Sequence, residues 1–324
     1  MYGVLEIGVR KLPRWLWIGL LAVGCFAVSV PGRASVPVEV GMRSIIDSPG
    51  LGKGRRIGRL ELAAAFELTS RDKRFGGLSG LLVENDRLTA VSDRASLWTA
   101  TIQRDAAGVV TGLQRWRVEA VGAVDRLGGP DVESLARLPD GSLIAAAEGP
   151  ARALALEGRM PPSAARLAGI FAELPYNEGI EALATMPDGS LLAFAEALGD
   201  DGLHPTAILS ADGVRRMGYH APEGFAPTAT DRSGGRVFVL ERRFSILGGL
   251  EARIAVLDAG DLHEGAVLAG EELGRLGVDN VAENFEGLAA TRAEDGRVAL
   301  YLLADDNFNP LQRTLLLQFF WKPE

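Results

Sequence analysis

The chain has 324 residues, of which 42 are acidic and 34 basic, so its formal net charge at pH 7 is −8. An acidic surface argues against nucleic acid as a partner, because proteins bind the phosphate backbone with positive charge. The single cysteine excludes an intrachain disulfide, and the length is sufficient for a large hydrophobic core.

The N-terminal segment has the order of features that is typical of a secretory signal. Basic residues within 10–14 precede an apolar run over 15–30, and Gly32 and Ala34 occupy the −3 and −1 positions of a cleavage site. The apolar run is shorter than the about 20 residues that a membrane-spanning helix needs. We therefore predict a signal peptide over residues 1–34, export to the periplasm or the medium, and no stable membrane span after cleavage.

Cleavage after Ala34 would remove the only cysteine and move the net charge from −8 to −11. The alternative is a lipoprotein anchored at Cys25. It is disfavoured because Ala22 stands where a lipoprotein signal prefers a larger aliphatic residue. Residues 35–56 are rich in Gly, Pro, Ser and Arg without an apolar period, which predicts a leader arm before a folded domain over 57–324.

From residue 57 onward, a unit of about fifty residues recurs five times. The units open with Ser79-Gly80-Leu81, Glu133-Ser134-Leu135, Glu181-Ala182-Leu183, Pro227-Thr228-Ala229 and Glu286-Gly287-Leu288. A first strand then reaches a turn, such as Pro-Asp-Gly-Ser at 139–142 and 187–190, whose Gly and Asp favour chain reversal. We predict second strands at 87–92, 142–147, 190–195, 236–240 and 297–304. Third strands are predicted at 97–103, 152–156, 205–210, 252–258 and 313–320. The first four units each have a predicted fourth strand, at 114–121, 165–174, 214–219 and 266–273.

Short strands, evenly spaced turns and the absence of a helical period predict an all-β fold, a β-propeller with five four-stranded blades. Six blades is the alternative, because the intervals between units are uneven. The fifth unit ends without a fourth strand, whereas residues 59–68 form a strand without a partner. We expect this N-terminal strand to complete the last blade and close the ring, which leaves no free sheet edge.

An acid follows the second strand of every unit: Asp93, Glu148, Glu196, Glu241 and Asp305. In a blade, the start of the first strand and the end of the second lie at the same mouth of the central channel. Like charges that converge there repel each other unless a proton or a cation intervenes. Ca²⁺ takes several oxygen ligands, so we predict calcium as the cofactor and these five acids as its ligands.

The first strands add Glu133, Glu181 and Glu286 at the same mouth, as further ligands or as general bases. Arginines follow the acids at Arg94, Arg242 and Arg313, either to bind an anionic substrate group or to neutralise the acids. Zinc is disfavoured, because the three histidines are scattered and no cysteine remains. A serine nucleophile at Ser79 is disfavoured, because its surroundings lack the strand-to-helix turn and a histidine base.

Several longer motifs together resemble a known family. They are Gly76-Gly77-Leu78-Ser79-Gly80-Leu81 with Val91-Ser92-Asp93-Arg94, Asp131-Val132-Glu133-Ser134-Leu135, Asn177-Glu178-Gly179-Ile180-Glu181-Ala182-Leu183, Glu283-Asn284-Phe285-Glu286-Gly287-Leu288 and the segment 305–317. The chain is similar, over most of 70–321, to the phytase-like family described as having esterase-like activity. This resemblance implies an exported, calcium-dependent propeller that hydrolyses a small ester or phosphoester. All four lysines lie outside the mouth positions, so the lysine-rich phosphate cradle of alkaline phytases is missing.

The leading hypothesis is thus a hydrolase whose metal polarises a small-molecule ester and lowers the pKa of a bound water. Two alternatives stay open. One is a lactonase resembling the gluconolactonase-type propellers. The other is a non-catalytic periplasmic binding or scaffold propeller whose acids hold a structural ion.

Overall fold

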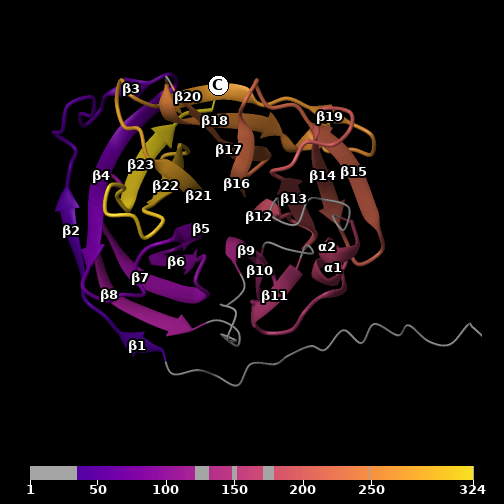
Figure 1. Cartoon of the computed structure of the whole chain (residues 1–324), viewed down its shortest axis with the longest axis horizontal. Coiled ribbons are helices and arrows are strands. Elements are labelled where there is room, and N and C mark those ends of the chain that lie inside the picture. The colour runs from indigo at the N-terminus through magenta and orange to yellow at the C-terminus, as the bar shows by residue number, and fades with distance from the viewer. Residues whose placement is uncertain (1–34, 121–130, 148–151, 171–178, 247, 324) are drawn as a thin grey trace, which may run out of the picture.

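The computed structural model describes residues 35–120, 131–147, 152–170, 179–246 and 248–323, which form a ring of five β-sheets around a central axis (Figure 1). The predicted all-β propeller with five blades is confirmed. Residues 1–34, predicted to be a signal peptide, lie outside the described residues. Within the described part of the chain, no helix is long and apolar enough to cross a membrane.

Each blade is an antiparallel meander whose first strand lies nearest the axis (Figure 1). The first strands are β5 (Leu78–Glu84), β9 (Val132–Arg137), β12 (Ile180–Thr185), β16 (Ala226–Ser233) and β21 (Asn284–Arg292). The second strands are β6 (Arg87–Ser92), β10 (Leu143–Ala147), β13 (Leu191–Ala195), β17 (Arg236–Ser245) and β22 (Val298–Asp305). The third strands are β7 (Ser96–Arg104), β11 (Arg152–Glu157), β14 (His204–Leu209), β18 (Gly249–Asp258) and β23 (Leu315–Trp321).

The outer strands are β8 (Val110–Ala120) in blade 1, β15 (Val214–Tyr219) in blade 3, β20 (Glu271–Leu276) in blade 4 and β4 (Leu60–Ser70) in blade 5. Because β4 pairs with β23, the N-terminal strand completes the last blade as expected. The segment 35–56 adds β1 (Val36–Pro37) to the edge of blade 1 and β2 (Val40–Ser44) to the edge of blade 5. The leader segment therefore spans the seam where the ring closes, and β3 (Arg56–Ile57) continues it by pairing with β4.

The fourth strand predicted at 165–174 in blade 2 is wrong. Two short helices, α1 (Pro162–Ala165) and α2 (Leu167–Ile170), stand there, and residues 171–178 lie outside the described residues. Pro161 and Pro162 explain the start of α1, since proline suits the first turn of a helix and cannot donate to a strand ladder. The buried side chains of Ala164 and Leu167 pack into the core that blade 2 shares with blade 3.

The stretch predicted as one strand at 266–273 is divided between two blades. Its first part, β19 (Val267–Leu268), pairs with β15 of blade 3, and only its last residues belong to β20 of blade 4. A short 3-10 helix, η1 (Ala259–Asp261), reverses the chain before β19. The chain between β18 and β20 of blade 4 therefore adds a short strand, β19, to the outer edge of blade 3.

Five buried hydrophobic clusters hold the ring together, one at each interface between neighbouring blades. The cluster between blades 4 and 5 contains Phe238 and Leu240 of β17 and Phe319 and Trp321 of β23. Each blade thus buries both faces, which explains why the second strands read as nearly continuous apolar runs rather than as alternating ones.

Gly287, in the first strand of blade 5, packs closely against the first strand of blade 1. A Cβ atom built on it would lie 2.8 Å from Leu303 Cβ, 2.9 Å from Leu81 Cβ and 2.9 Å from the Ser79 carbonyl oxygen. We expect Gly287→Ala to lower the free energy of unfolding by about 1–3 kcal/mol, because overpacking forces the backbone apart. Thermal denaturation should show a lower Tm, whereas Gly213→Ala, which meets no atom within 4 Å, should leave Tm nearly unchanged. An equal, small effect of both changes would contradict this close packing.

Candidate functional site

A β-bulge interrupts the first strand of every blade at an equivalent register. The pairs before the bulge are Leu78↔Ser92, Val132↔Ala147, Ile180↔Ala195, Pro227↔Glu241 and Phe285↔Ala304. The first-strand residues that follow these pairs, in the bulges, are Ser79, Glu133, Glu181, Thr228 and Glu286. A bulge takes a side chain out of the regular alternation and re-aims it. The fold therefore places five polar side chains at equivalent positions around the axis, three of them carboxylates.

A cavity of about 300 Å³ lies at this end of the axis. Among the described residues, its lining contains seven carboxylates, two amides and one guanidinium: Asp93, Asp131, Glu133, Glu181, Glu196, Glu286, Asp305, Asn284, Asn307 and Arg242. The glutamates Glu133, Glu181 and Glu286 also line a second space of about 10 Å³, which has room for about one water molecule. The predicted convergence of acids from several blades thus exists as a polar cavity around the axis.

The cavity brings together most of the residues that the sequence marks. From the second strands these are Asp93, Glu196 and Asp305, joined by Arg242, and from the first strands all three predicted glutamates. Asp131 adds a carboxylate from just before β9. Glu148, the predicted contribution of blade 2, lies outside the described residues.

Glu241 does not lie with the other acids, which corrects its prediction as a metal ligand. Its backbone pairs with Pro227, at the register that Ala147 and Ala195 occupy in blades 2 and 3. The residue equivalent to Glu196 is therefore Arg242. The spacing in the sequence does not reveal this offset: Glu148 and Glu196 stand seven residues after the positive-φ turn glycine of their units, and the same count from Gly234 reaches Glu241.

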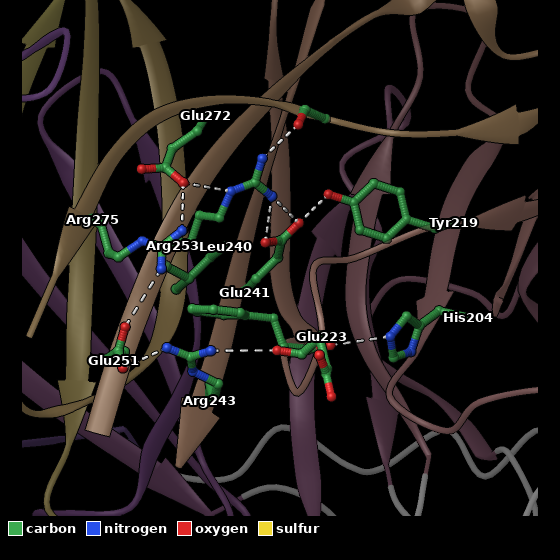
Figure 2. Close-up of polar contacts among 12 residues, drawn as sticks. His204, Tyr219, Glu223, Leu240, Glu241, Arg243, Glu251, Arg253, Glu272 and Arg275 are labelled. Atoms are coloured by element: carbon green, nitrogen blue, oxygen red, sulfur yellow. Dashed lines mark hydrogen bonds and ion pairs between the residues drawn. The ribbon is translucent and has the colours of Figure 1, made fainter. Parts of the chain in front are cut away.

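Glu241 instead faces blade 3 and is fully buried (Figure 2). Arg253 Nη1 donates to both of its carboxylate oxygens, at 2.7 and 2.6 Å, and the Tyr219 hydroxyl donates to Oε1. Burial raises the pKa of Glu241, while the bonds from Tyr219 and Arg253 oppose this rise. The remaining donors of Arg253 bind Glu272 Oε2 at 3.0 Å and the Gly270 carbonyl at 2.6 Å. Glu241 is thus part of a satisfied structural network between blades.

Arg242 supplies a positive charge at the position where other blades carry acids. Its guanidinium donates to Asn284 Oδ1 and Glu286 Oε1, and its Nη2 lies 3.6 Å from Glu196 Oε1. Burial alone would lower the pKa of Arg242, but the surrounding carboxylates raise it above its usual value. In the described part of the lining, Arg242 is therefore the one permanent cation, and it contacts acids of blades 3 and 5.

The acids of the cavity hold protons more tightly than free carboxylates do. Burial, with the charges of Glu286 and Asp93, raises the pKa of Asp305 to about 8. Burial, with the charges of Asp131 and Glu286, raises that of Asp93 to about 6. The pKa of Glu133 also rises well above its usual range, through burial and the charges of Glu181 and Glu286. Without a bound cation, part of this cluster is protonated at neutral pH.

The donor chemistry of the cavity fits a hard cation. Carboxylate and amide oxygens are the ligands that Ca²⁺ takes, and Asp93 Oδ1 is buried without a hydrogen-bond partner. Within the described ranges, however, no three Asp, Glu, His or Cys side chains stand close enough together to hold a metal ion. Since the carboxylates repel one another, an ion would have to draw them inward.

The other two predicted arginines lie away from the cavity lining. Arg94 is exposed, and its guanidinium carbon lies 3.4 Å from the ring centre of Phe308. Arg313 Nε donates to Glu283 Oε1 at 2.7 Å. In the described structure each therefore contacts the chain itself, and a role in substrate binding stays a prediction for both.

Comparisons with known proteins identify a family for this sequence. A family model described as phytase-like, esterase-like activity of phytase, matches residues 73–308. No curated protein matches the sequence.

Solved structures with a similar chain path include one provisionally described as a gluconolactonase, with 16% identity, 89% of this chain and 95% of that chain covered, and a TM-score of 0.42. A gluconolactonase from Xanthomonas campestris has 12% identity and a TM-score of 0.39, with 90% of this chain and 99% of that chain covered. A protein of unknown function from Dyadobacter fermentans has 12% identity and a TM-score of 0.40, with 87% of this chain and 100% of that chain covered.

Proposed function

Because the chain belongs to the phytase-like family that is described by esterase-like activity, we propose that it is a cation-dependent hydrolase of a small ester. The observation that carries the proposal is the cavity of about 300 Å³ at the propeller axis, with seven carboxylates and one arginine. Acids with raised pKa values in a concave polar pocket are typical of catalytic sites. Export, predicted from residues 1–34, is part of the same proposal.

The charge of the cavity favours a neutral ester over a phosphoester. Among the described lining residues, seven carboxylates stand against one arginine, which gives a negative cavity even with part of the acids protonated. A phosphate group in contact with these carboxylates would meet like charge. We therefore propose a carboxylic ester, open-chain or cyclic as in a lactone, as the substrate class, and not phytate.

The roles of individual residues follow from their environment. Burial and the charges of Glu181 and Glu286 raise the pKa of Glu133, so its carboxylate, when ionised, is a stronger base than a free one and is suited to take a proton from an attacking water. The protonated Glu133 can then return this proton to the departing alcohol. The guanidinium of Arg242 offers N–H donors to the oxygen that becomes negative during attack.

The cofactor that we propose is Ca²⁺. Asp93, Glu196 and Asp305, with Glu181 and Glu286, are the residues that would hold it. When bound, a cation supplies polarisation of the ester carbonyl and a more acidic water. It would also neutralise the mutual repulsion of the carboxylates.

The test is turnover of 4-nitrophenyl acetate, δ-valerolactone and 4-nitrophenyl phosphate by the mature chain, with Ca²⁺ or with a chelator. We expect turnover of the two neutral substrates, its loss in chelator, and a fall in kcat of about 10²-fold or more for Glu133→Gln. Glu157→Gln, on the outward part of the same blade, is the matched control and should keep the wild-type rate. Absence of turnover on all three substrates, together with a Ca²⁺-dependent rise in Tm, would favour the scaffold alternative.

A further inference from the structure

One blade carries an extension beside the cavity. The second strands of blades 1, 2 and 3 end at Ser92, Ala147 and Ala195, and that of blade 5 ends one residue further, at Asp305. In blade 4, β17 continues four residues beyond the equivalent Glu241, and its pairing with β18 persists to Ser245↔Gly249. A β-hairpin therefore projects past the rim of the mouth at blade 4.

The projecting hairpin presents apolar side chains next to the cavity. Side chains two apart in a strand share a face, so Phe244 lies on the same face as Arg242, about 7 Å further along the strand. The side chains of Phe244 and Ile246 are 70% and 94% exposed. Val278, in the connection from β20 to β21, is 74% exposed and lies 3.9 Å from a Cβ atom built on Gly249 of the same hairpin.

The opposite face of the hairpin is braced by charged and aromatic contacts (Figure 2). Arg243 Nη2 donates to Glu251 Oε1 at 2.7 Å, and Arg275 Nη1 lies 3.6 Å from Glu251 Oε2. Both arginines also lie over the ring of Phe225, at 4.6 and 5.1 Å from its centre. The exposed apolar face is therefore carried by a hairpin that is fixed at its base.

Exposed apolar residues gather at this end of the ring. Among the described residues, seven large hydrophobic side chains are exposed. Five of them lie at this end of the ring: Phe244 near the end of β17, and Leu198, Ile246, Val278 and Leu311 in connections between strands. Single exposed apolar residues are ordinary, but several around one polar cavity point to a binding surface. Arg242 lines the cavity and Phe244 stands two residues further along the same strand, so the apolar face of the hairpin begins beside the cavity.

We propose that the hairpin face formed by Phe244 and Ile246 binds the apolar part of the ester substrate while its carbonyl group lies in the cavity beside Arg242. The inference rests on the proposed function and narrows its substrate class to esters with a medium or long hydrocarbon chain. Two features support this occupant. The negative cavity disfavours anionic substrates, and the exposed Phe244 and Ile246 side chains favour each CH₂ group that they remove from water.

The experiment compares kcat/KM for 4-nitrophenyl octanoate and 4-nitrophenyl acetate. We expect the wild type to prefer octanoate, and the double change Phe244→Ser, Ile246→Ser to lower the octanoate-to-acetate ratio at least tenfold. Val267→Ser is the matched control, because Val267 is 65% exposed on the outer strand β19, away from the mouth. Its ratio should equal that of the wild type.

The outcomes separate this inference from the proposed function. If 4-nitrophenyl acetate is hydrolysed and the double variant keeps the wild-type octanoate-to-acetate ratio of kcat/KM, the inference is wrong while the proposed function stands. If no ester is hydrolysed, binding of 1-octanol followed by NMR decides: binding that is weakened only in the double variant supports the apolar surface, and equal binding refutes it. Sedimentation of the wild type, but not the double variant, with phosphatidylcholine vesicles would assign the surface to a membrane instead and overturn the proposal.

Discussion

Glu241→Ala should lower the free energy of unfolding by about 3–5 kcal/mol, because it leaves the buried guanidinium of Arg253 without its main partner. Glu241 is fully buried and receives two bonds from Arg253 and one from the Tyr219 hydroxyl. Removing one member of such a pair costs more than the pair contributes, since an uncompensated charge remains in the core. In a chain of this size we expect Tm to fall by about 10 °C.

Glu272 provides the matched control, because it pairs with the same arginine from a more exposed position. Its side chain is 40% exposed and its Oε2 lies 3.0 Å from Arg253 Nε. Glu272→Gln should cost about 1 kcal/mol or less, as exposed ion pairs usually do. Differential scanning calorimetry of both variants, with and without Ca²⁺, makes the comparison.

The same measurement decides whether Glu241 has any part in cation binding. If it is structural, Glu241→Ala should lower Tm equally in Ca²⁺ and in chelator, so the rise in Tm on adding Ca²⁺ should persist. If the variant has nearly normal stability but its Tm no longer rises on adding Ca²⁺, Glu241 is a metal ligand after all.

The sequence was sufficient for the architecture because a propeller repeats its own pattern. Five units with turns at equivalent points predict five blades, and the unpaired strand before Ser79 predicts closure of the ring. Both hold in the structure. The second blade departs because Pro161 and Pro162 replace a strand with short helices, which a β-like reading of 165–174 misses.

The sequence predicts which end of the propeller carries the site, but not which residue of each strand faces the cavity. Acids after apolar second strands marked the correct mouth, yet a β-bulge in each first strand sets which neighbour faces the cavity. In blade 4 the acid and the arginine are adjacent, so an offset of one residue exchanges a buried structural Glu241 for a cavity-lining Arg242. The correct unit in that blade is Thr228-Ala229-Thr230, not Pro227-Thr228-Ala229. Bulges depend on tertiary contacts around the axis, which periodicity does not encode.

Asp305→Asn should make the cation-free protein more stable at pH 8, which is the opposite of what loss of a paired carboxylate does. Asp305 is 2% exposed, and burial together with the charges of Glu286 and Asp93 raises its pKa to about 8. In the unfolded chain its pKa is about 3.9. Between these values the folded state holds a proton that the unfolded state has released, so stability falls as the pH rises from about 4 to 8.

An asparagine has nearly the same shape and no charge to lose, and its amide oxygen can still accept the 2.8 Å bond from the Asn307 N–H. In chelator we expect the Tm of Asp305→Asn to exceed that of the wild type at pH 8 by on the order of 5 °C, and the two to converge near pH 4. Asp295→Asn is the control, because contacts with Arg297 lower the pKa of that exposed acid, and its removal should give no gain at pH 8.

Adding Ca²⁺ at pH 8 should shrink or reverse the difference in Tm between Asp305→Asn and the wild type. If Asp305 is one of the carboxylates that hold the ion, the wild type gains stability from binding, whereas Asp305→Asn gains much less, so their Tm values approach or cross. A variant that is less stable than the wild type in chelator at every pH would show that the cavity carboxylates do not repel one another. Since that repulsion is the physical reason for proposing a cation, the proposed cofactor would fall with it.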